Sequence, residues 1–194
     1  MHEARAARRA PERTARRRGP SPPYDRLVPF AYYDGLSRRD QAEYRRSDAI
    51  AAIPLRGAGG LGPAVEALGA ALALDDERAV AVASAEIVGR ISLALGAPAP
   101  MVQVLAVRPR QDWGELHGLY TQGEDAAVIR VWMRTARHAR VVAFRTFLRT
   151  LLHELCHHLD VEVLGLSRSF HTEGFFKRES SLFFQLVPTP ARGR

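Results

Sequence analysis

The sequence predicts an α+β fold with helices in its N-terminal half, a small three-stranded sheet, a long helix and a C-terminal helix. Three strand-like runs lie between residues 101 and 133. Residues 139–164 contain neither glycine nor proline and carry apolar residues at helical spacing. The 194 residues are 46% hydrophobic and 25% charged, so the chain is long and apolar enough to bury a core without disulfides.

Three helices are expected before the sheet. A polar helix over 38–52 begins at a capping-box-like pair, Ser37 and Asp40, and stops before a proline. A second helix, over 63–74, has proline at its first position, where the missing N–H has no helical partner to lose. An aspartate at position 75 or 76 can cap a third helix, over 76–95, whose apolar residues recur at four-residue spacing and are expected to face the core.

The sheet is predicted from three runs. The run over 101–107 is rich in β-branched residues and follows a break of glycine and proline residues. A weaker run over 115–121 and a third run over 127–133 are separated by a turn. In the third run, alternate apolar residues share one face, as they do in a strand.

The long helix over 139–164 is the most informative element. Its apolar stripe indicates a helix that lies through the middle of the domain, and Gly165 ends it. The stripe consists of Val141, Phe144, Leu148, Leu151, Leu155 and Leu159.

The formal net charge of +7 belongs to the two ends of the chain. Residues 1–20 hold seven arginines against two glutamates, and the last four residues add two arginines. Residues 21–190 carry 19 basic and 19 acidic groups. We therefore expect a disordered Arg- and Pro-rich tail over 1–23, one domain over 24–187 and a C-terminal tail over 188–194.

Several classes of protein are disfavoured by composition. No apolar run approaches the 18 or so residues that a membrane span needs, and the charged N-terminus lacks the apolar core of a secretory signal. Cys156 is the only cysteine, so neither an intrachain disulfide nor a cysteine-based zinc cluster is possible. These observations favour a cytoplasmic protein without a membrane partner.

Residues 153–157 read His-Glu-Leu-Cys-His, which is the H-E-x-x-H pattern on a predicted helix. His153 and His157 are four residues apart, so both imidazoles project from one face and can bind a single Zn²⁺. Glu154 is turned about 100° from His153, where it can accept a proton from a water on the open side of the metal.

A catalytic zinc needs a third protein ligand, for which the sequence offers three candidates downstream. His171 is favoured because the break at Gly165 allows the chain to fold back over the metal. Glu173 is the next candidate, and Glu179 would also complete a His-His-Glu site. Asp160 lies on the face of His153 and can orient an imidazole or be an exposed helix carboxylate.

Each of four other polar residues allows two interpretations. His117 and Tyr120 could stabilise an oxyanion, but core or surface roles are more common for such residues. His158 points away from His157 and is expected on the helix surface or behind the ligands. Arg178 could pair with its neighbour Glu179 or line the cleft.

An HExxH pattern followed by a histidine fourteen residues later and an aromatic four residues after that resembles the SprT-like and WLM zinc metalloproteases, the Spartan type. The matching positions are His153, Glu154, His157, His171 and Phe175. The resemblance covers about residues 101–185 and implies a zincin-like fold, with helices on a small sheet and three histidine ligands. Thr172 stands where that family often has glycine, and the chain lacks a cysteine zinc ribbon.

Together these features predict a zinc-dependent peptidase that acts on a protein or peptide, with Glu154 as general base. We expect the strand over 127–133 to be a sheet edge to which an extended substrate adds. One alternative is a non-catalytic zinc-binding domain with a regulatory role. Another is a nucleic-acid-associated protein that uses the Arg-rich tail, which could equally be a solvated tail without a partner.

Overall fold

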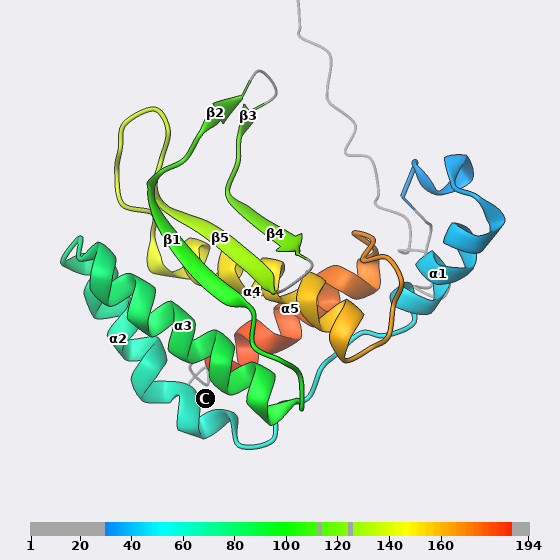
Figure 1. Ribbon diagram of the computed structural model, residues 1–194, viewed down its shortest axis with the longest axis horizontal. Helices are drawn as coiled ribbons and strands as arrows, with labels where there is room; N and C mark the ends of the chain where they lie inside the picture. The colour runs from blue at the N-terminus through cyan, green and yellow to red at the C-terminus, as the bar shows by residue number, and fades with distance from the viewer. Residues whose placement is uncertain (1–29, 112–113, 124–125, 188–194) are drawn as a thin grey trace, which may run out of the picture.

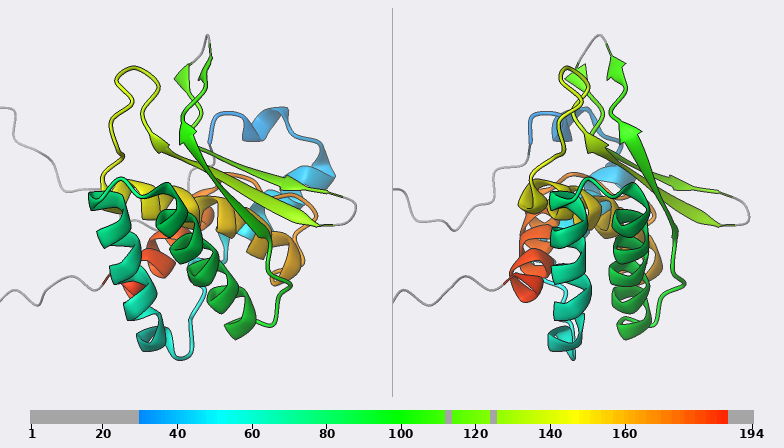
Figure 2. Two further views of the ribbon diagram at one scale, coloured as in Figure 1. Left: turned by 60° about the vertical axis from the view of Figure 1, so that its left-hand side comes forward. Right: turned by 90° about the vertical axis from the view of Figure 1, so that its left-hand side faces the viewer.

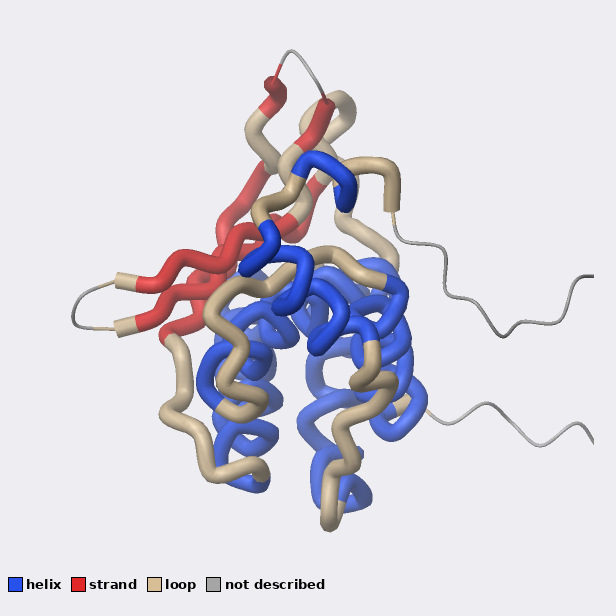
Figure 3. Tube along the Cα trace, turned by 90° about the vertical axis from the view of Figure 1, so that its right-hand side faces the viewer, coloured by secondary structure: helices blue, strands red, loops and turns tan. Residues whose placement is uncertain are grey.

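The computed structural model describes residues 30–111, 114–123 and 126–187. It is α+β, as predicted, with a small mixed sheet and the long helices gathered on one side of it (Figures 1, 2 and 3). The tails expected at 1–23 and 188–194 lie outside the described residues. Within the described ranges, none of the helices combines the length and the apolar character needed to cross a bilayer.

The three N-terminal helices form close to their predicted positions, as α1 (Arg38–Asp48), α2 (Gly62–Ala73) and α3 (Glu77–Ala94). The hydroxyl of Ser37 accepts a hydrogen bond from the Asp40 backbone N–H at 3.1 Å, which is the expected N-terminal cap. The third helix is capped by the aspartate at position 76 and not by the one at position 75.

Helix α1 is shorter than the predicted 38–52. It ends at Asp48, and the carbonyl oxygens of Ser47 and Ile50, at and just after this end, each accept a hydrogen bond from the Arg178 guanidinium at 2.6 Å. The chain that leaves α1 is therefore held by a side chain from another helix.

The main sheet has the strand order β1-β5-β4, formed by β1 (Met101–Val107), β4 (Gly118–Gln122) and β5 (Ala127–Arg134). Strand β1 is parallel to β5, and β4 is antiparallel to it. The predicted run over 115–121 is divided between β4 and the short strand β3 (Gly114–Glu115), which pairs with β2 (Arg110–Gln111).

The prediction that the strand over 127–133 is a sheet edge is wrong. Strand β5 lies between the other two, and Ile129, Val131 and Met133 are completely buried. Its nearly continuous apolar sequence is typical of a strand that is covered on both faces, as central strands often are. The edge nearer the long helix is β4, whose Leu119 is exposed.

The long helix, α4 (Phe144–Glu162), begins five residues later than predicted. Val141 forms an antiparallel bridge to Arg134, and the backbone N–H of Val142 donates to the Met133 carbonyl at 2.7 Å, so this segment extends the pairing of β5. From residue 144 onward, α4 packs against β4, β5 and the C-terminal helix α5 (Glu173–Leu186). The four leucines of its predicted apolar stripe are completely buried, whereas Phe144 is partly buried and Val141 precedes the helix.

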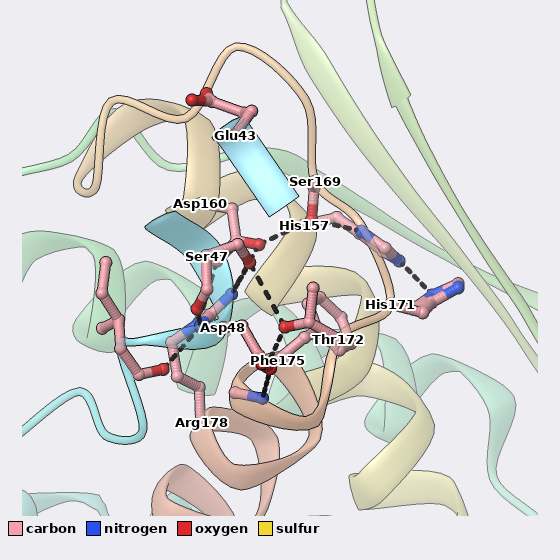
Figure 4. Close-up of polar contacts among 12 residues, drawn as sticks. Glu43, Ser47, Asp48, His157, Asp160, Ser169, His171, Thr172, Phe175 and Arg178 are labelled. Carbon is pink, nitrogen blue, oxygen red and sulfur yellow. Dashed lines mark hydrogen bonds and ion pairs between the residues drawn. The ribbon is translucent and has the colours of Figure 1, made fainter. Parts of the chain in front are cut away.

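A buried ion pair joins α1, α4 and α5. Arg178 of α5 donates to the carboxylate of Asp160 of α4 through Nε at 3.1 Å and through a terminal nitrogen at 2.9 Å, and both side chains are completely buried. The same guanidinium donates to the Ser47 hydroxyl at 3.0 Å and to the two carbonyls at the end of α1. Arg178 therefore pairs with Asp160 and not with its neighbour Glu179 (Figure 4).

We expect Arg178→Met to lower the free energy of unfolding by about 3–5 kcal/mol, because the Asp160 carboxylate would stay buried without its cation. Urea unfolding followed by circular dichroism measures this change. Lys177→Met is the matched control, since Lys177 forms an exposed pair with Glu173, and such pairs contribute about 1 kcal/mol or less. Equal losses in the two variants would contradict a stabilising role for the buried pair.

Candidate metal site

The structure brings the imidazoles of His153, His157 and His171 together. His153 and His157 lie one turn apart on α4, and His171 lies in the loop between α4 and α5. The Nε2 atom of His171 is 3.0 Å from Nε2 of His153 and 3.0 Å from Nε2 of His157, and one nitrogen from each ring lies within 4.8 Å of the others. Tetrahedral zinc with bonds of 2.0–2.1 Å holds its ligand nitrogens about 3.3 Å apart, so these three side chains are close enough to hold a metal ion.

His153 is oriented by a carboxylate behind it. Its Nδ1 lies 3.2 Å from the Glu179 carboxylate, which also accepts a hydrogen bond from Arg149 at 3.0 Å. With the Nδ1 proton donated to Glu179, the lone pair of Nε2 faces the other two imidazoles. Glu179, which was a candidate third ligand, thus lies on the far side of the His153 ring.

His157 is oriented through a serine. Its Nδ1 lies 2.8 Å from the Ser169 hydroxyl, and that hydroxyl donates to Asp160 at 2.7 Å (Figure 4). Because the Ser169 proton goes to the carboxylate, its oxygen accepts from Nδ1 and leaves Nε2 free for a metal. Asp160 therefore orients an imidazole, which was one of its two predicted roles, but it does so through Ser169.

Burial and neighbouring imidazoles lower the pKa of two of the three histidines. Burial, followed by the proximity of His153 and His171, lowers the pKa of His157 to about 3. Burial, followed by the proximity of His153, also lowers the pKa of His171, whereas Glu179 acts in the opposite direction. Neutral imidazole is the form that binds metal, so both rings are ready to do so near pH 7.

The loop that carries Ser169 and His171 is held against the N-terminal part of the chain. Arg46 of α1 donates to the carbonyl oxygens of residues 164 and 165 at 2.8 and 3.0 Å, and Glu43 accepts from the backbone N–H of residue 167. The hydroxyl of Tyr32 donates to the His171 carbonyl at 2.8 Å. These contacts fix the path of the chain as it returns over the end of α4.

Phe175 forms the floor beneath the three imidazoles. Its ring is completely buried, with centroid distances of 4.9, 4.7 and 5.1 Å to His153, His157 and His171. The Thr172 hydroxyl accepts from the Phe175 N–H at 3.0 Å and caps α5. The aromatic residue of the sequence pattern thus has a packing role, and threonine at 172 serves as a helix cap.

Glu154 is nearly buried between α4 and the edge strand β4. Burial raises the pKa of its carboxyl group, whereas His153 and the Tyr120 backbone act in the opposite direction. A Cβ added to Gly118 would lie 2.7 Å from Cγ and 2.9 Å from Cδ of Glu154. Glycine at position 118 is therefore what allows the edge strand to approach the glutamate so closely.

A groove passes over this site beside β4. It consists of two cavities, of about 520 and 480 Å³, which share Gly118, His153 and Glu154 as lining residues. One cavity follows β4 towards Gln122, and the other follows the first turns of α4.

The remaining predicted candidates lie away from the imidazole cluster or only at its margin. Glu173 pairs with Lys177 at 2.7 Å on the surface of α5. His158 is buried, and its Nε2 donates to the Pro98 carbonyl at 2.7 Å while Nδ1 faces the Tyr120 hydroxyl at 3.3 Å. His117 is exposed and lines the groove.

Sequence reasoning missed Ser169 and Gly118. Nothing in the local pattern around Ser169 marks it, since its partners are nine and twelve residues away in the chain. Gly118 does carry a signal, because a glycine within a strand often marks the close approach of another group.

No protein-family model, curated protein or solved structure matches this chain.

We expect Ser169→Ala to weaken zinc binding by about 10- to 100-fold, because His157 loses the acceptor that orients its ring. Competition with a chromogenic chelator measures the affinity. Ser167→Ala is the matched control, since this exposed serine in the same loop is held through its backbone N–H. Affinities that stay equal in the two variants would remove Ser169 from the metal site.

Proposed function

We propose that this chain is a zinc-dependent peptidase with a zincin-like catalytic domain, similar to the SprT-like and WLM enzymes. The observation that carries the proposal is the convergence of three imidazole Nε2 atoms in a groove that Glu154 lines beside a strand edge. Three imidazole nitrogen donors suit zinc and leave one coordination position open, as catalytic zinc sites require. A cytoplasmic location remains part of the proposal.

His153, His157 and His171 would hold the metal, which when bound supplies Lewis acidity on the open side of the imidazoles. Glu179 and Asp160 would keep the rings oriented, the latter through Ser169. Because both carboxylates lie behind the imidazoles, they stabilise the ligands without occupying the open position.

Glu154 would act as the general base. Its carboxylate takes a proton from the water that attacks the peptide carbonyl, and it then gives this proton to the leaving amine. Its position one residue after His153 turns it away from the ligand face and towards β4. The absence of a side chain at Gly118 leaves the space that the Glu154 carboxylate occupies beside the edge strand, which supports this role.

The edge of β4 that has no paired strand among the described residues would bind the substrate backbone. Strand β4 pairs with β5 along one edge, and residues 118–120 and 122 line the groove. An extended peptide that adds to this edge would place its carbonyl groups beside Glu154 and the imidazoles. Strand addition is thus proposed for β4, in place of the strand over 127–133.

Glu154→Gln tests the mechanism. We expect the purified variant to keep its zinc, because the three imidazoles are unchanged, while peptide hydrolysis falls by about 100-fold or more. Glu162→Gln is the matched control, since this exposed glutamate of the same helix lies outside the groove. Zinc content by mass spectrometry and cleavage of a peptide library give the two readouts.

Unchanged hydrolysis in Glu154→Gln would remove this residue from the mechanism. A zinc-loaded wild-type protein that cleaves no peptide in the library would instead favour the non-catalytic zinc-binding domain. The proposed nucleic-acid-binding role of the Arg-rich tail concerns residues outside the described part of the chain and is a separate question.

A further inference from the structure

We propose that the groove selects a peptide with an acidic side chain on one side of the scissile bond, and that Arg145 is the residue that recognises it. This inference rests on the proposed peptidase function and adds a substrate class to it. The relevant part of the groove is the cavity of about 520 Å³ beside the first turns of α4, here called the α4 arm. It is lined by His117, Arg145, Thr146, Arg149, Thr150 and Glu179 in addition to the residues shared with the other cavity.

Arg145 presents an unneutralised charge to the α4 arm. Its side chain is exposed, and it forms no ion pair within the part of the chain that the structure describes. The guanidinium lies over the ring of Phe183, 4.8 Å from the ring centroid, which supports the group from below. A supported guanidinium with free N–H donors is a good partner for a carboxylate.

The other charged residues of the α4 arm are paired or lie at its far end. Glu179 binds Arg149 at 3.0 Å and faces Nδ1 of His153 at 3.2 Å, so its charge and that of Arg149 offset each other. Glu154 is buried beside Gly118 and lies where the two cavities meet. Over the first turns of α4, Arg145 therefore carries the charge that has no ion-pair partner among the described residues.

The position of Arg145 sets the distance of the acidic residue from the cleaved bond. Arg145 precedes His153 by eight residues, or about 12 Å along the helix axis. An extended peptide advances about 3.3 Å per residue. The acidic side chain is therefore expected two to four residues from the scissile bond, on the side that lies over the first turns of α4.

A peptide fits this arrangement better than a nucleic acid does. A single free guanidinium beside a strand edge matches one carboxylate on an extended backbone. Binding to nucleic acid normally uses several cations along the phosphate backbone. Within the α4 arm, the second arginine is already paired with a glutamate.

The test uses the full-length zinc-loaded protein and one cleavable peptide, in which glutamate, glutamine or lysine is placed at each of the four positions on either side of the scissile bond. For the wild type, we expect glutamate two to four residues away on one side to raise kcat/KM about fivefold over glutamine. Arg145→Glu should reverse this preference, so that lysine is favoured at the same position. Arg145→Gln should abolish it.

Arg78→Glu is the matched control. It makes the same change in net charge on α3, outside both cavities of the groove, and should keep the wild-type preference. This control separates recognition by Arg145 from attraction by the arginines of the N-terminal segment. If Arg145→Glu and Arg78→Glu show the same preference, the inference is overturned.

Binding distinguishes failure of this inference from failure of the proposed function. Fluorescence anisotropy with zinc-loaded Glu154→Gln should show tighter binding of the glutamate peptide than of the glutamine peptide, and addition of Arg145→Glu should remove the difference. This result would support the inference even if the wild type cleaved nothing, whereas equal binding of the two peptides would contradict it. If an oligonucleotide displaces the glutamate peptide and its own binding depends on Arg145, the charge serves a nucleic acid and the inference fails.

Discussion

The buried ion pair between Asp160 and Arg178 is the interaction on which the geometry of the site depends. Two charges without contact with water are tolerated only when their hydrogen-bonding groups find partners. Arg178 finds them in Asp160, in the Ser47 hydroxyl and in two carbonyls at the end of α1. The Asp160 carboxylate also accepts a hydrogen bond from the Ser169 hydroxyl, which in turn lies against Nδ1 of His157. The same contacts thus join three helices and fix one imidazole.

A second constraint acts from the opposite side of the groove. The edge strand β4 packs so closely on Glu154 that any side chain at position 118 would force the glutamate to move. The proposed base therefore lies between a helix and a strand. Of the proposed ligands, His153 is oriented by Glu179 and His157 by Ser169, and Phe175 packs beneath all three imidazoles. This arrangement keeps the charged groups behind the imidazoles and leaves the groove side open for a metal and a peptide.

Local sequence signals predicted the elements better than their arrangement. The cap at Ser37, the apolar stripe of α4 and the helical spacing of His153 and His157 depend on neighbouring residues, and all are present in the structure. The central position of β5 and the late start of α4 result from pairing between distant segments, which periodicity does not encode. The closeness of His171 to the other two histidines depends likewise on contacts of its loop with α1.

The most direct test of the proposed metal site is zinc K-edge X-ray absorption of the full-length protein loaded with one equivalent of zinc. We expect three imidazole nitrogens and one oxygen, all at about 2.0–2.1 Å, and the loss of one imidazole in His171→Ala. A spectrum that His171→Ala leaves unchanged would contradict the proposed metal site. A first shell with fewer than three imidazoles in the wild type would do so as well.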